Sequence, residues 1–316
     1  MASTAPSGRV PDPTWPFREE QALCNVTSTA QTQLLNEPGF QGVWEQLVTD
    51  IVDRQAWKVE SFDSLATLDG YCEDVRHYPV ENERIRMNQR RDAALRLRSN
   101  PGRWSRIALD ALRELAVDSL GPAVAILAQS GFLAAFEDFA VHTRYFQVTR
   151  NLMESAGITV FVSGHASSSI HDVDKLDPIM LAGYSERWED GKDTSLWRAC
   201  LESHYSLNPH HQQHELWHAD DSDDKCVCTP GKERFKLKER SSWREECWKA
   251  LPELLCDKSS RRLQKELDGV VSREMWTVQS QFYSGMPDVW LERATKMAAQ
   301  LAESTPSAHS NVTVAT

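Results

Sequence analysis

Histidines gather in one stretch of the chain. Seven of the ten lie between residues 165 and 218, and His142 precedes them on a segment with a helical pattern. Within the stretch, His171 and Asp172 are adjacent. Imidazole nitrogens and carboxylate oxygens are the ligands that divalent zinc, iron and manganese accept in proteins. This concentration therefore predicts a divalent metal site.

The helices expected around these residues could position such ligands. A histidine from the helix before the His171-Asp172 pair, and one or two from the helix after it, would complete a coordination shell between helices that pack side by side. The alternative is that the histidines bridge buried polar groups without a metal, since a neutral imidazole has one donor and one acceptor to satisfy. Both interpretations place the histidines inside the fold.

The order of the motifs resembles the domain of unknown function 5662 family, a set of uncharacterised proteins. Its members carry a helical histidine, then His-Asp-x-Ser-Lys, a tyrosine, a histidine ahead of Asn-x-His-His, and a tryptophan. The corresponding residues of this chain are His142, His171, Asp172, Lys175, Tyr184, His204, Asn208, His210, His211 and Trp217. The resemblance covers roughly residues 135 to 220, with a weaker match at 286 to 292.

More distantly, the order resembles that of the HD-domain phosphohydrolases, which are helical and bind one or two divalent metals through histidines and a His-Asp pair. This resemblance implies hydrolysis of a phosphate ester, with a nucleotide-like substrate as one candidate. It also implies roles for individual residues: metal ligation by His142, His171, Asp172 and His211, a phosphate contact or ligation by His204, and neutralisation of substrate charge by Lys175.

The chain departs from these patterns in two places. Asp174 stands where the family has a serine, and the last expected helix offers Lys296 where a late acidic ligand is expected. In addition, residues 220 to about 262 read as an insertion. The late acidic ligand is therefore predicted to be missing.

Two other functions fit part of the sequence. Residues 214 to 218 match H-E-x-x-H, which on an α-helix would hold zinc for peptide hydrolysis; the polar residues before it argue against a core-facing helix. The second is a non-enzymatic helical protein whose metal or histidine cluster is structural. An open coordination position would distinguish a catalytic metal from a structural one.

Helical periodicity dominates the rest of the chain and predicts an all-α, multi-helix bundle with an HD-like arrangement of the histidine-rich helices. We expect disordered tails at 1–20 and 301–316, a helical N-terminal region at 21–130 and a metal-binding helical domain rich in histidine and aspartate at 131–300. Residues 158–164 form the only β-branched run. The arginine-rich segment 81–98 is expected to be a solvated helix face that pairs with carboxylates.

Composition restricts the partners. The formal net charge is −11 with 26% charged residues, which makes a nucleic-acid partner unlikely on electrostatic grounds. The N-terminus lacks the apolar core of a secretory signal and no apolar run is long enough for a membrane span, so a cytoplasmic location is expected. Seven cysteines without a compact framework predict reduced thiols.

Overall fold

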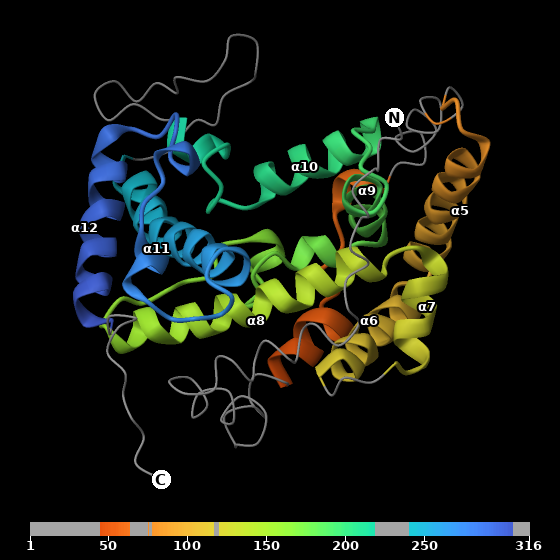
Figure 1. The fold of residues 1–316 in the computed structure, drawn as a ribbon, viewed down its shortest axis with the longest axis horizontal. Coiled ribbons are helices and arrows are strands. Elements are labelled where there is room, and N and C mark those ends of the chain that lie inside the picture. The colour runs from red at the N-terminus through yellow and green to blue at the C-terminus, as the bar shows by residue number, and fades with distance from the viewer. Residues whose placement is uncertain (1–44, 64–74, 76–77, 117–119, 219–239, 306–316) are drawn as a thin grey trace, which may run out of the picture.

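The computed structural model describes residues 45–63, 75, 78–116, 120–218 and 240–305, and in these ranges the chain is helical without any strand (Figure 1). The prediction of an all-α protein is confirmed, and residues 158–164 run without regular structure. The long helices are α5 (Glu81–Arg98), α6 (Pro101–Ala116), α7 (Pro122–Ser130), α8 (Leu133–Ser155), α9 (Pro178–Trp188), α10 (Ser195–Leu207), α11 (Arg240–Lys265) and α12 (Asp288–Ser304).

Short helical turns precede α5 and lie in the connections between later helices. They are η2 (Thr49–Asp53), η3 (Glu60–Phe62), η4 (His165–Ser167), η5 (Val173–Leu176), η6 (Glu215–His218), η7 (Arg273–Trp276) and η8 (Ser280–Phe282). In the described residues, no helix is long and apolar enough to cross a membrane.

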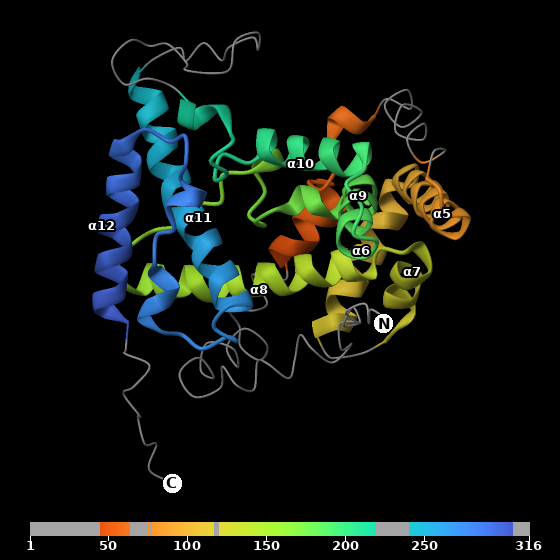
Figure 2. The same ribbon diagram turned by 45° about the horizontal axis from the view of Figure 1, so that its top comes forward.

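Helix α8 joins the two ends of the molecule (Figures 1 and 2). Its first half places Phe136 and Phe139 in a core that α5, α6, α7 and α9 share. Its second half places Tyr145 and Phe146 in another core, formed with α11, η7 and α12. A third apolar cluster lies between η6, α11 and α12 around Trp217 and Trp290. Residues near the middle of α8 can therefore meet side chains from both ends.

The start of α9 is fixed by a buried aspartate. Asp177 caps the helix by accepting a hydrogen bond from the Ile179 N–H at 2.9 Å, and Pro178 occupies the first helical position, where its missing N–H costs nothing. The same carboxylate accepts from Arg98 of α5 at 2.9 Å. This contact fixes the helix that directly follows the His171-Asp172 turn.

Buried ion pairs tie α5 to α9. Arg91 donates two hydrogen bonds to Glu186, at 2.7 and 3.0 Å, and both side chains are almost fully buried. Arg90, also buried, binds Glu189 and Asp190. The predicted pairing with carboxylates elsewhere is thus confirmed, whereas the predicted solvation of this face is wrong for Arg90 and Arg91, because α9 packs over them.

Candidate metal centre

Four parts of the chain bring histidines and carboxylates together in the interior. Helix α8 contributes His142, the turn before η5 contributes His171 and Asp172, α10 and the loop after it contribute three more histidines, and α11 contributes two carboxylates. The members are His142, His171, Asp172, His204, His210, His211, Glu253 and Asp257, and each is at most 8% exposed. We refer to these eight residues as the centre.

The backbone of Asp172 is unusual. Its φ of 58° lies in the left-handed region, which aspartate tolerates better than most residues with a side chain. This conformation turns the chain sharply between His171 and η5. As a result, both side chains of the adjacent pair point into the same interior space, as the motif had suggested.

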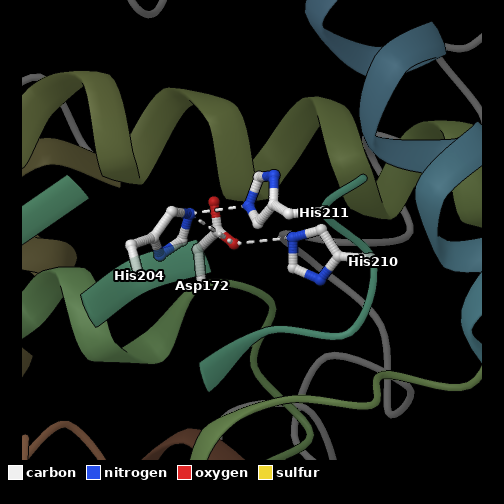
Figure 3. Close-up of side chains that lie close together, drawn as sticks. All are labelled: Asp172, His204, His210 and His211. Carbon is white, nitrogen blue, oxygen red and sulfur yellow. Dashed lines mark hydrogen bonds and ion pairs between the residues drawn. The ribbon is translucent and has the colours of Figure 1, made fainter. Parts of the chain in front are cut away.

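Three imidazole rings face one oxygen of Asp172, and Figure 3 draws two of them, those of His204 and His210. Its Oδ1 lies 3.1 Å from Nε2 of His210 and 3.4 Å from Nε2 of His171. The Nε2 of His204 is 3.6 Å from the same oxygen. Among the described residues, the 3.1 Å contact between this oxygen and His210 is an ion pair, and neither of its atoms nor Nε2 of His171 makes a hydrogen bond of good geometry. Buried polar atoms without well-formed hydrogen bonds are costly, so this group of atoms is a candidate for binding a cation.

The opposite ring nitrogens are held by carboxylates. Glu253 Oε1 lies 3.0 Å from Nδ1 of His171 and 3.2 Å from Nδ1 of His210. Asp174 Oδ2 lies 2.7 Å from Nδ1 of His204. A carboxylate on one ring nitrogen orients the ring and directs the other nitrogen toward a metal in many metalloproteins. Asp174, which departs from the family's serine, therefore orients a histidine of the centre.

A second group of ligand atoms lies beside the first. Asp257 Oδ1 is 2.9 Å from Nε2 of His142 and 3.5 Å from Nε2 of His171. His142 thus has Asp257 as its partner on Nε2, and its Nδ1 makes no hydrogen bond within the described part of the chain. Phe146, one turn along α8, stacks on His171 with ring centroids 3.9 Å apart. These contacts give two groups of ligands that meet at His171 and Asp172.

His211 is the most exposed of the eight residues of the centre, at 8%. Its Nε2 lies 2.8 Å from Nε2 of His204. Since His204 has its other nitrogen on Asp174, its Nε2 carries a lone pair in the neutral ring. A proton on His211 or a shared cation satisfies both nitrogens.

Electrostatics favour the metal-binding form for part of the centre and oppose it for the rest. Burial lowers the pKa of His142 to about 3 and holds the pKa of His211 well below its usual value, because a buried imidazolium loses its hydration. Burial alone would raise the pKa of Asp172, but His171 and Lys175 hold it well below its usual range. In contrast, Glu253 and Asp172 overcome burial and raise the pKa of His210 to about 10. The pKa of His171 is also raised, chiefly by Asp172 against the effect of burial. The carboxylates and His142, His204 and His211 therefore favour the forms that bind metals, whereas a metal would have to displace a proton from His210.

Each of the two aspartates has a lysine on its second oxygen. Lys175 Nζ is 2.7 Å from Asp172 Oδ2, and Lys258 Nζ is 2.6 Å from Asp257 Oδ2. Lys175 is buried and also lies over the Tyr184 ring, 5.4 Å from its centroid. The centre therefore has cations beside both carboxylates.

The structure brings together the six residues that were predicted to bind the metal or the phosphate. His142, His171, Asp172 and His211 are members of the centre, and Lys175 contacts it. His204 is also a member, with its ring between Asp172 and Asp174.

The late acid is the main correction to the sequence-based expectations. Lys296 lies on the exposed side of α12, paired with Glu292, whereas Asp257 of α11 occupies the place beside His142 and His171. Asp257 and Glu253 both come from the stretch expected to be an insertion. Their four-residue spacing within an apolar helical run was the available signal, because it puts both carboxylates on one buried helix face.

The H-E-x-x-H match and the cysteine pair are not part of the centre. Residues 215–218 form a short 3-10 turn, so the α-helical geometry that H-E-x-x-H requires is not formed there. Cys226 and Cys228, whose C-x-C spacing could form a structural zinc site with His214 and His218, lie outside the described residues. A cavity of about 730 Å3 is lined by Arg54, Lys58, His165 and the outer face of α10, and none of its lining residues belongs to the centre.

Comparison of the chain with protein-family models, with curated proteins and with solved structures finds no match in any of the three.

Proposed function

We propose that the protein is a metal-dependent phosphohydrolase that acts on a nucleotide-like phosphate ester, with divalent manganese, iron or zinc in the centre. The observation that carries this proposal is that three Nε2 atoms converge on Asp172 Oδ1. Two of these nitrogens and the oxygen do so without forming hydrogen bonds of good geometry. Such a group of ligand atoms suits a bound cation better than it suits a hydrogen-bonded core.

The residues would hold two ions. His142, His171 and Asp257 form one candidate set, and Asp172, His204, His210 and His211 form another. Asp172 lies 3.4 Å from His171 and 4.0 Å from His142, so it is also within reach of the first set. Bound divalent ions supply a lowered pKa for water and polarisation of a phosphoryl oxygen.

The chain's own groups would support phosphate chemistry. Glu253 and Asp174 keep the rings in place, which preserves the site's geometry when substrate binds. Lys175 stands beside Asp172 and would neutralise the charge of a phosphoryl group. The resemblance of the motif order to the HD-domain phosphohydrolases supports the same reaction class.

Metal content and hydrolysis test the proposal together. The wild type would be compared with a His171→Ala, Asp172→Ala double variant, and with His165→Ala as a matched control, because His165 lies outside the centre. We expect near-stoichiometric metal in wild type and control but not in the double variant. We expect the same pattern for cleavage of p-nitrophenyl phosphate and its diester. Absence of metal in folded wild type, after reconstitution with manganese, iron and zinc, would contradict the proposal.

The depth of the centre favours a second candidate, a metal site that is only structural. Asp172 is 3% exposed and His210 is fully buried. Water exchange distinguishes the two candidates: in the manganese-loaded protein, a hydrolase needs an exchangeable water on the metal and should enhance water proton relaxation. A structural site closed by protein ligands should give no enhancement.

A further inference from the structure

Lys258 contacts the centre through Asp257 and is itself partly exposed. The side chain of Lys258 is 21% exposed, whereas that of Asp257, the next residue along α11, is only 4% exposed. Its ammonium group lies 5.6 Å from the centroid of the Phe282 ring in η8. It is also close enough to His211 to contribute to the low pKa of that ring, after the larger effects of burial and of the neighbouring histidines.

The hydrogen-bonding capacity of Lys258 is only partly used. An ammonium group has three donors, and within the described residues the contact to Asp257 Oδ2 is the one hydrogen bond that it makes. Two N–H groups remain for another acceptor. The aromatic ring of Phe282 shields one side of the cation from water, which strengthens its attraction for an anion.

A second group near Asp257 is also unpartnered. Tyr283 is 2% exposed and its hydroxyl has no hydrogen-bond partner among the described residues. Burial raises the pKa of Tyr283, and the negative charge of Asp257 raises it further, which places the carboxylate nearby. A buried hydroxyl that lacks a partner is a second indication that an acceptor is missing in this region.

We propose that Lys258 is a substrate-binding residue that recognises an anionic oxygen, of the kind a phosphate ester carries, on the Phe282 side of the centre. The inference rests on the proposed function and extends it by assigning the anion contact to α11, in addition to Lys175 in η5. Lys258 would hold Asp257 with one donor and the anion with the others. A substrate with a neutral group at this position would lose the contact.

Phosphate binding tests the proposal without relying on turnover. Inorganic phosphate would be titrated into manganese-loaded protein by calorimetry, using wild type, Lys258→Met, Lys258→Arg and Lys249→Met. Methionine keeps the apolar stem and removes the charge. Lys249 is the matched control, because it lies on the same helix, is about half exposed and pairs with Glu245.

We expect Lys258→Met to keep its manganese and to bind phosphate about tenfold more weakly, the usual effect of losing one charge-assisted hydrogen bond. Lys258→Arg should recover most of the affinity, and Lys249→Met should match wild type. Unchanged phosphate affinity in Lys258→Met with full manganese would overturn the inference alone. So would loss of manganese in that variant, which would make Lys258 a support of the metal ligands. A wild type that binds none of manganese, iron and zinc would overturn the proposed function and the inference together.

Discussion

The Glu253 carboxylate faces two imidazole rings at once. One oxygen lies 3.0 Å from His171 and 3.2 Å from His210, while the other accepts two hydrogen bonds from Ser163, both at 2.7 Å. It is fully buried, and the two imidazoles hold its pKa at about 2 although burial alone would raise it. Glu253 therefore fixes two candidate ligands through one charge.

Replacing that charge with a neutral amide should weaken metal binding. We expect Glu253→Gln to reduce the affinity for manganese or zinc about 10- to 100-fold, because the amide orients the rings less strongly and makes them poorer donors. Competition with a chelating dye measures the affinity. Glu246→Gln, an exposed position on the same helix, is the control and should match wild type. Equal affinities in the two variants would mean that Glu253 only fills space.

Glu137 of α8 gives a stability prediction at the same scale. Burial, and to a lesser extent Glu189, raise its pKa from 4.5 to about 7. The folded state thus binds a proton more tightly than the unfolded state, so this group's contribution to stability is present below pH 4.5 and is lost as pH rises toward 7. Glu137→Gln keeps the neutral form at every pH. Its free energy of unfolding minus that of wild type should therefore be about 1–2 kcal/mol larger at pH 8 than at pH 5. Urea unfolding at both pH values measures this, and a pH-independent difference would refute it.

At the scale of elements, the sequence predicts some parts of the centre well and others poorly. Histidine is an infrequent residue, so seven within one stretch stand out, and the turn at Asp172 agrees with its His-Asp motif. Carboxylates are common on helix surfaces, so Glu253 and Asp257 look ordinary in sequence. Only the packing of α11 against α8 shows that they face inward. The helices could be predicted from periodicity, but which helix closes the centre depends on tertiary contacts.

The contribution of the α5–α9 contact to the stability of the fold can be tested through a buried ion pair. Glu186 accepts from both Arg91 and Thr194, and all three side chains are buried. We expect Arg91→Met to lower the free energy of unfolding by about 3–5 kcal/mol, because it leaves a buried carboxylate without its partner. The double variant Arg91→Met, Glu186→Leu should recover part of this loss.

Arg84→Met on the same helix is the control for this experiment. Arg84 makes an exposed pair with Glu81 at 3.8 Å, and such pairs contribute about 0–1 kcal/mol. Denaturant unfolding of all four proteins would separate the effects. If Arg91→Met and Arg84→Met were equally stable, the buried pair would not hold α5 to α9.

At the scale of the whole molecule, the centre lies where separate cores meet. His142 sits between the two halves of α8 that serve different cores, His204 comes from the helix that packs on α9, and Asp257 comes from α11. An ion bound by these residues would connect segments that otherwise touch mainly along α8. Occupancy should therefore affect the stability of the entire fold rather than that of one helix.

This connection predicts a global response to metal. Free manganese at a hundred times its dissociation constant should raise the free energy of unfolding by about 2.7 kcal/mol, because it binds the folded state only. Thermal unfolding followed by circular dichroism at 222 nm and by tryptophan fluorescence should shift together, and a chelator should reverse both shifts. The His171→Ala, Asp172→Ala variant should show neither shift. If only the fluorescence responded, the ion would be stabilising its immediate surroundings without joining the cores, and the two ends of α8 would unfold independently.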